Sequence, residues 1–114
     1  MKVRDIIEKL DLKIICGEAY IDKEIEGAYT CDLLSWVMSH GSKNNIWITV
    51  QVHPNVVAVA VLLEFSCIII PEDIDVEAVS IQKAESEGIP MLSSKDNGYE
   101  ICKKLSGLGI YNDN

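Results

Sequence analysis

The residues best suited to chemistry follow the apolar segment 46–50. There, Gln51, His53 and Asn55 form the densest polar cluster beside the expected core. Open α/β sheets usually hold ligands at the carboxyl ends of their strands, so this cluster predicts a binding edge. Pro54 suits the first turn of a helix, whose free N–H groups could receive an anion such as phosphate. The alternative is that His53, or the turn before it, caps the helix.

A second polar pair lies where an apolar segment gives way to another expected helix. Asp32 and Ser35 could contact a ligand from this neighbouring helix start, but a capping role for Asp32 is the simpler interpretation. Cys31 precedes this pair and is either a packed side chain or a reactive thiol. The predicted ligand-binding set is therefore Asp32, Ser35, Gln51, His53 and Asn55.

Motifs that would indicate an enzyme are missing. A phosphate loop ending at Gly41-Ser42-Lys43 would need a glycine where Trp36 stands, and Gly107-Leu108-Gly109 ends a helix where a dinucleotide motif would open one. Only two histidines exist, and neither stands beside a nucleophile. No catalytic residue is assigned, and the chain is not expected to be an enzyme.

The cysteines do not have the spacing of a metal site. None of the four approaches a C-x-x-C arrangement, so neither a metal nor another cofactor is predicted. Three of them lie in or beside apolar runs and are expected to pack in the core: Cys16, Cys67 and Cys102.

Composition excludes several classes of partner. The 114 residues carry a formal charge of −8 and no run of lysine and arginine, which argues against nucleic acid. The longest apolar run, 56–63, is too short to cross a bilayer, and the charged start of the chain does not resemble a signal peptide. We therefore expect a cytoplasmic protein with one domain, residues 1–114.

The pattern of apolar residues predicts alternating helices and strands. We expect helices over 3–10, from Asp32, over 54–63, over 75–87 and from Gly98, and strands over 12–16, 25–30, 46–50, 67–70 and 91–92. From Asp32 onward every strand follows a helix, which predicts an α/β fold with a parallel or mostly parallel sheet flanked by helices.

Two of these helices allow more detailed expectations. The β-branched run at 56–63 would suit a strand, but Pro54 favours a helix. Because this helix is apolar on every side, it should lie deep in the fold or in a subunit contact. In the helix at 75–87, one face should carry Val76, Val79 and Ala84. The two tryptophans, Trp36 and Trp47, are expected in the core or an interface.

Several segments together resemble the DRTGG domain family over nearly the whole chain. The resemblance rests on segments 27–38, 47–51, 53–60, 67–71 and 83–90, and on Gly109-Ile110. The chain departs from the naming motif at two places. It has His53-Pro54-Asn55 where relatives carry Asp-Arg, and Pro71-Glu72-Asp73 where they carry Thr-Gly-Gly.

The resemblance implies an α/β regulatory module without catalysis of its own, commonly at dimer contacts. Members resemble the N-terminal domain of HPr kinase/phosphorylase and also occur beside CBS domains in regulated pyrophosphatases. This chain lacks the kinase's phosphate-loop domain, so the kinase activity does not carry over. The departures from the motif argue against a ligand that needs the arginine charge or the glycine backbone.

These observations predict a non-catalytic regulatory or protein-interaction module that acts as a homodimer. One alternative is a sensor for a nucleotide or another phosphorylated metabolite, bound at the five polar residues. The net charge of −8 weighs against such an anionic ligand. An enzyme such as a serine kinase is the remaining alternative, and another protein is a further possible partner.

Overall fold

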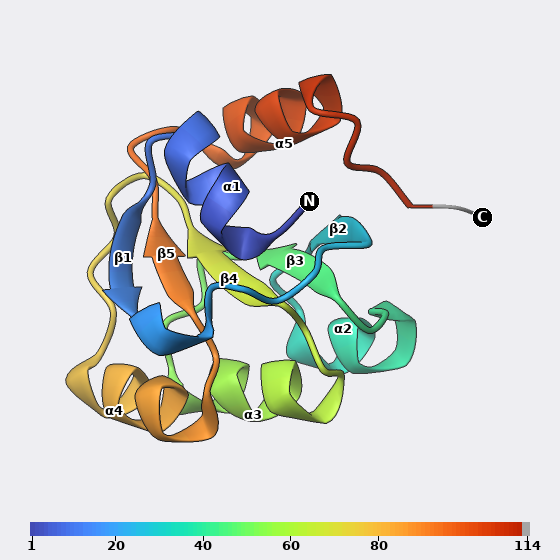
Figure 1. Cartoon of the computed structure of the whole chain (residues 1–114). Coiled ribbons are helices and arrows are strands. Elements are labelled where there is room, and N and C mark those ends of the chain that lie inside the picture. Colours follow the sequence, from blue (N-terminus) through green and yellow to red (C-terminus); the bar gives the residue numbers. More distant parts are fainter. Residues whose placement is uncertain (113–114) are drawn as a thin grey trace.

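A five-stranded sheet runs through the molecule in the computed structural model, which describes residues 1–112 (Figure 1). Its spatial order is β1-β5-β4-β3-β2. The strands are β1 (Lys13–Cys16), β2 (Gly27–Thr30), β3 (Asn45–Ile48), β4 (Cys67–Ile70) and β5 (Met91–Ser93). Only β1 runs antiparallel to its neighbour, so the prediction of a mostly parallel α/β sheet is confirmed.

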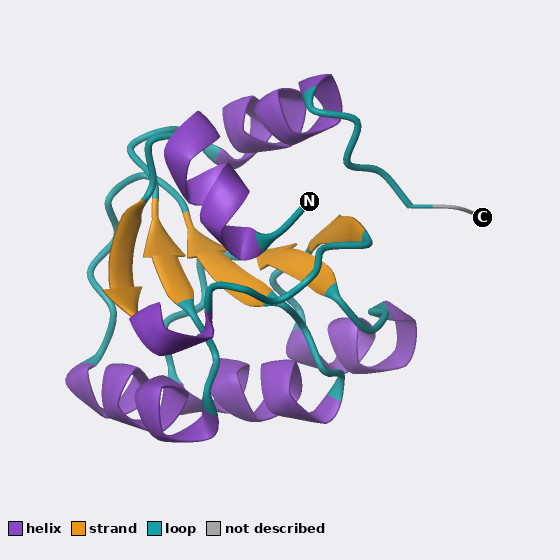
Figure 2. Cartoon of the chain, viewed as in Figure 1, coloured by secondary structure: helices purple, strands orange, loops and turns teal. Residues whose placement is uncertain are grey.

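Helices cover both faces of this sheet (Figures 1 and 2). One face carries α1 (Val3–Lys9) and α5 (Gly98–Gly107). The other carries α2 (Leu34–His40), α3 (Pro54–Leu62) and α4 (Ala78–Glu87), and a short 3-10 helix, η1 (Glu18–Tyr20), follows β1. Among the residues described, no helix has both the length and the apolar character that crossing a membrane requires.

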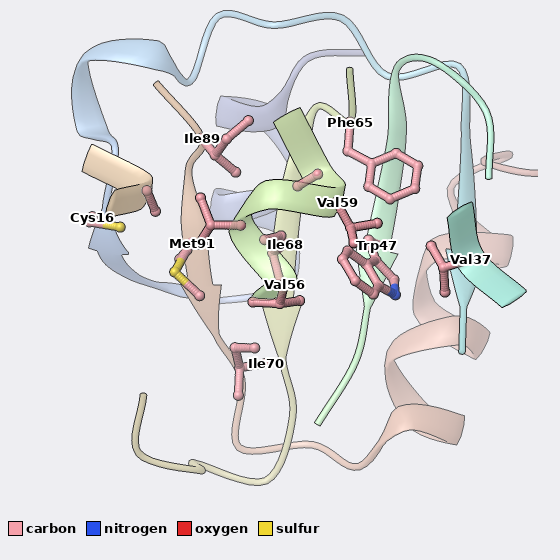
Figure 3. Close-up of a cluster of buried hydrophobic side chains, with 13 residues drawn as sticks. Cys16, Val37, Trp47, Val56, Val59, Phe65, Ile68, Ile70, Ile89 and Met91 are labelled. Atoms are coloured by element: carbon pink, nitrogen blue, oxygen red, sulfur yellow. The ribbon is translucent and has the colours of Figure 1, made fainter. Parts of the chain in front are cut away.

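The central strands β3 and β4 are buried along their whole length. Alternate side chains enter two separate cores, with Trp47 and Ile68 under α2, α3 and α4, and Ile46 and Ile69 under α1 and α5. Figure 3 shows Trp47 beside Phe65, and their ring centroids lie 5.5 Å apart. Because both faces are covered, β4 is apolar throughout and β3 is apolar after its first residue, Asn45. Trp47 is thus a core residue, one of the two expected roles.

Two glycines make the close approaches of the chain possible. Gly17 ends β1 with φ +81°, and a Cβ there would lie 2.6 Å from Pro90 Cα. Gly88 follows α4 in the left-handed conformation, φ +74°, and the helix ends at Glu87, as predicted from the range 75–87. The first glycine lets β1 turn against the segment that enters β5.

Two expectations about helix starts were wrong. Leu33, not Asp32, is the N-cap of α2, because the carboxylate of Asp32 bonds to the next loop instead. The fourth helix starts at Ala78, not at residue 75, and Val79 is 60% exposed. Ser80 is buried in its place, because its hydroxyl donates to the Val52 carbonyl at 2.6 Å.

Candidate functional site

Two loops meet at the carboxyl edge of the parallel strands. One follows β2 and carries Asp32, whose Oδ1 accepts from Thr49 Oγ1 at 2.8 Å and from the Val50 N–H at 2.9 Å. The other follows β3 and returns a bond, since Gln51 Nε2 donates to the Asp32 carbonyl at 2.9 Å. The structure therefore brings the predicted pair Asp32 and Gln51 together, as a bracket between the loops.

Thr49 is the buried member of this bracket, and it is not among the residues predicted from the sequence. Its hydroxyl donates to Asp32 and accepts from the Gln51 N–H at 3.2 Å. It is only 2% exposed. The signal in the sequence is a hydroxyl at the end of an apolar run, because a buried hydroxyl requires a hydrogen-bond partner.

His53 is the N-cap of α3. Its Nδ1 accepts from the Asn55 N–H at 3.2 Å, and Pro54 occupies the first turn as predicted. The capping interpretation of His53 is thereby confirmed. This N–H is already bound to the imidazole, so it does not stand free for an anion.

Ser35 and Asn55 belong to a different environment. They line a hollow of about 360 Å³ between α2 and α3, whose other walls are Leu34, Met38, Ala58, Val59 and Leu62. We call this region the α2–α3 surface and define it by Leu34, Ser35, Met38, Asn55, Ala58 and Leu62. The five predicted residues thus divide into a loop bracket, a helix cap and the rim of an apolar hollow.

The α2–α3 surface lies in a part of the chain almost without charge. Between residues 33 and 63, Lys43 is the only charged side chain, and its Nζ lies 3.5 Å from Glu64. The chain as a whole carries −8. Leu62 is 63% exposed and Met38 48% exposed, so the surface presents large apolar side chains to solvent. Each helix buries one face in the core, and an exposed face without charged residues is typical of a contact surface rather than a solvated one.

The four cysteines are free thiols. Burial raises the pKa of Cys16 and of Cys102, and it raises the pKa of Cys67 to about 12. The packing role is confirmed for Cys16 and Cys67, which are buried, and for Cys102, which is half-buried and packs against the core under α1 and α5. Cys31 is also half-buried and packs against the other core. Within residues 1–112, no cluster of three histidine, cysteine, aspartate or glutamate side chains could hold a metal ion.

Comparison with known protein families gives no match, and none of the curated proteins matches either. Among solved structures, the chain is similar to the regulatory region of Clostridium perfringens pyrophosphatase, which contains CBS and DRTGG domains and is complexed with its activator, diadenosine tetraphosphate. The TM-score is 0.70 at 13% identity, over 90% of this chain. The chain spans 45% of that structure's length. This likeness shows a shared fold and supports the resemblance to the DRTGG domain.

The loop after β4 adds a detail to that resemblance. By that resemblance, Glu72 and Asp73 correspond to the glycines of the family motif, and both have positive φ, 59° and 52°. Their N–H groups donate to the carbonyls of Asp96 and Ser94, each at 2.9 Å. The backbone therefore has, without glycine, a conformation that glycine adopts most easily.

Proposed function

We propose that this chain is a non-catalytic regulatory module that acts as a homodimer through the α2–α3 surface. The observation that carries the proposal is an exposed apolar surface without charge on a chain of net charge −8. Two copies that meet there bury apolar side chains and avoid bringing their acidic faces together. The shared fold with a pyrophosphatase regulatory region supports the regulatory role.

The second candidate is a sensor of a small phosphorylated ligand. It is supported by the neighbour, whose regulatory region is complexed with a nucleotide activator. The hollow between α2 and α3 also has the size of a small-molecule site, with Ser35 and Asn55 as its polar groups. The dimer is the better supported of the two, because a phosphorylated ligand needs cationic partners and Lys43 is the only cation between residues 33 and 63.

Light scattering of the full chain, with and without ATP, ADP, AMP and diadenosine tetraphosphate, tests the proposal. We expect twice the 12.7 kDa chain mass in every sample. Leu62→Glu places a charge on this surface and should yield a monomer. Tyr99→Glu is the matched control, since Tyr99 is 75% exposed on α5, across the sheet, and should leave the dimer intact.

Each other result has a definite meaning. A monomeric wild-type protein at tens of micromolar contradicts the dimer. A mass that changes with one nucleotide favours the sensor, and Ser35→Ala and Asn55→Ala should then weaken that response. Loss of the dimer in both glutamate variants would place the contact outside the α2–α3 surface.

A further inference from the structure

The strand β2 forms an open edge of the sheet, because β3 is its only partner strand within residues 1–112. Along the outer side of β2, Ala28 uses both of its backbone groups. Its N–H donates to Asn112 Oδ1 at 3.0 Å, and its carbonyl accepts from Asn112 Nδ2 at 3.1 Å. A carboxamide is chemically a peptide group, so Asn112 supplies the donor and the acceptor that a neighbouring strand would supply.

The surroundings of Asn112 fit this group closely. Asn45, which is 3% exposed, donates from Nδ2 to the same Oδ1 at 3.3 Å. A Cβ at Gly27 would lie 1.8 Å from that oxygen, so only glycine leaves room for it. The edge at Ala28 is thus a receptor for an amide group. Asn45 supplies a buried second donor, and Gly27 leaves the space because it has no side chain.

Hollows lie on both faces of the sheet beside this receptor. On the α5 face, a hollow of about 240 Å³ has apolar walls that include Ile48 and Leu105. On the α2 face, a hollow of about 760 Å³ is lined by Trp36 and by polar side chains that include His40 and Lys43. Successive residues of a strand point to opposite faces, so a strand added to β2 would place its side chains alternately in the two hollows.

We propose that the β2 edge is a strand-addition site for an extended peptide segment of another protein. The peptide pairs with Ala28 through its backbone and presents apolar residues to the α5 face and polar residues to the α2 face. Asn112 occupies the amide receptor within the chain and competes with the peptide. Figure 1 shows the segment after α5 descending on the side of the molecule where β2 lies. This site is separate from the α2–α3 surface.

An NMR titration of the ¹⁵N-labelled full chain tests the site. The probe is the peptide acetyl-Val-Asn-Val-Asn-Val-amide, and the matched control is the same peptide with alternate backbone nitrogens methylated. We expect the probe to shift the amide signals of Ala28 and Thr30. Asn112→Ala removes the competitor and should tighten binding about tenfold. Methylation of the peptide should abolish binding.

Ala28→Pro, placed in the Asn112→Ala background, removes the edge donor and should abolish binding, because an edge strand accepts proline. Hydrogen exchange gives a check that needs no proline variant: the Ala28 amide should exchange slowly in the wild type and faster in Asn112→Ala.

Three results would overturn the proposal. They are equal exchange rates of the Ala28 amide in the wild type and Asn112→Ala, β2 signals that do not change at millimolar probe, and binding of the methylated peptide as tight as that of the probe. An Asn112→Ala dimer that protects β2 would overturn it as well, since the partner would then be a second copy. Leu62→Glu should bind the probe normally, which separates this test from that of the α2–α3 surface.

Discussion

The burial of Cys67 has a direct chemical consequence. Its pKa is raised from 9.0 to about 12 in the folded protein, so the folded state holds the thiol proton at pH values where the unfolded chain has lost it. The contribution of Cys67 to the free energy of unfolding is fully present below pH 9. It should fall as the pH rises from 9 toward 12, by about 1.4 kcal/mol per pH unit. Urea unfolding under reducing conditions, at several pH values across this range, measures the fall.

Cys67→Ala should make that alkaline decline less steep, whatever it does to stability at neutral pH. The part that comes from the raised pKa values of Cys16 and Cys102 should remain. Cys31→Ala is the control, because it removes a thiol that is only half-buried. If the wild type and Cys67→Ala lose stability in parallel above pH 9, burial of this thiol is not the cause.

Glu72 and Asp73 are strained residues whose replacement should stabilise the protein. A left-handed backbone costs a residue with a Cβ about 1–2 kcal/mol, while glycine adds some entropy to the unfolded chain. Glu72→Gly and Asp73→Gly should therefore each gain about 0.5–1 kcal/mol, read as a higher urea midpoint. Asp75→Gly in the same loop also removes a carboxylate, but this residue does not have positive φ. It should lose stability, and an equal gain there would indicate a charge effect.

At the scale of residues, the sequence predicted where polar groups gather but not how they pair. The cap at His53 follows from Pro54 beside it, a signal within one turn. The hydrogen bond from Thr49 to Asp32 joins residues 17 positions apart, and no pattern among neighbouring residues predicts it. The sequence favoured Asp32 as the cap of the helix that follows it, because the N–H groups of that helix are the hydrogen-bond partners nearest in sequence.

Among the elements, the close contact of β1 with the segment entering β5 depends on Gly17. Gly17→Ala should cost at least about 3 kcal/mol, because its Cβ would meet Pro90 Cα at 2.6 Å with φ at +81°. Gly107→Ala is the matched control, since no atom lies within 4 Å of its Cβ position and it ends a helix. It should gain up to about 1 kcal/mol. Thermal unfolding of both variants measures these changes in stability. Equal changes in Gly17→Ala and Gly107→Ala would contradict the steric argument.

Elements with strong local signals were predicted best. The strand β4 has the predicted bounds, 67–70, because it is apolar throughout and ends at Pro71. The start of α4 was misplaced because Val76 suits a helix by spacing, whereas the chain is still in the loop that ties Asp73 to Ser94. The exposure of Val79 was not predicted. The hydrogen bond from Ser80 to the Val52 carbonyl turns the face with Ser80 toward the core, so Val79 lies on the solvent side.

For the whole molecule, net charge makes a prediction about association. Two copies of charge −8 repel each other, while the proposed contact contains no ion pair that salt could weaken. Raising NaCl from about 0.02 M to about 0.5 M should therefore strengthen the dimer, as measured by sedimentation velocity. A dimer that weakens over this range would instead be held by charge pairs.

The uncharged α2–α3 surface also determines which chemical probes can detect contact there. It contains no lysine, so amine-reactive cross-linkers have no attachment point on it. Met38 is the alternative reporter, because its thioether is half exposed and can be oxidised to a sulfoxide. Covered by a partner, Met38 should resist peroxide; once oxidised, it would place a polar oxygen in the contact and oppose reassembly. An oxidant would then keep separated copies apart, because it reaches Met38 only while the surface is uncovered.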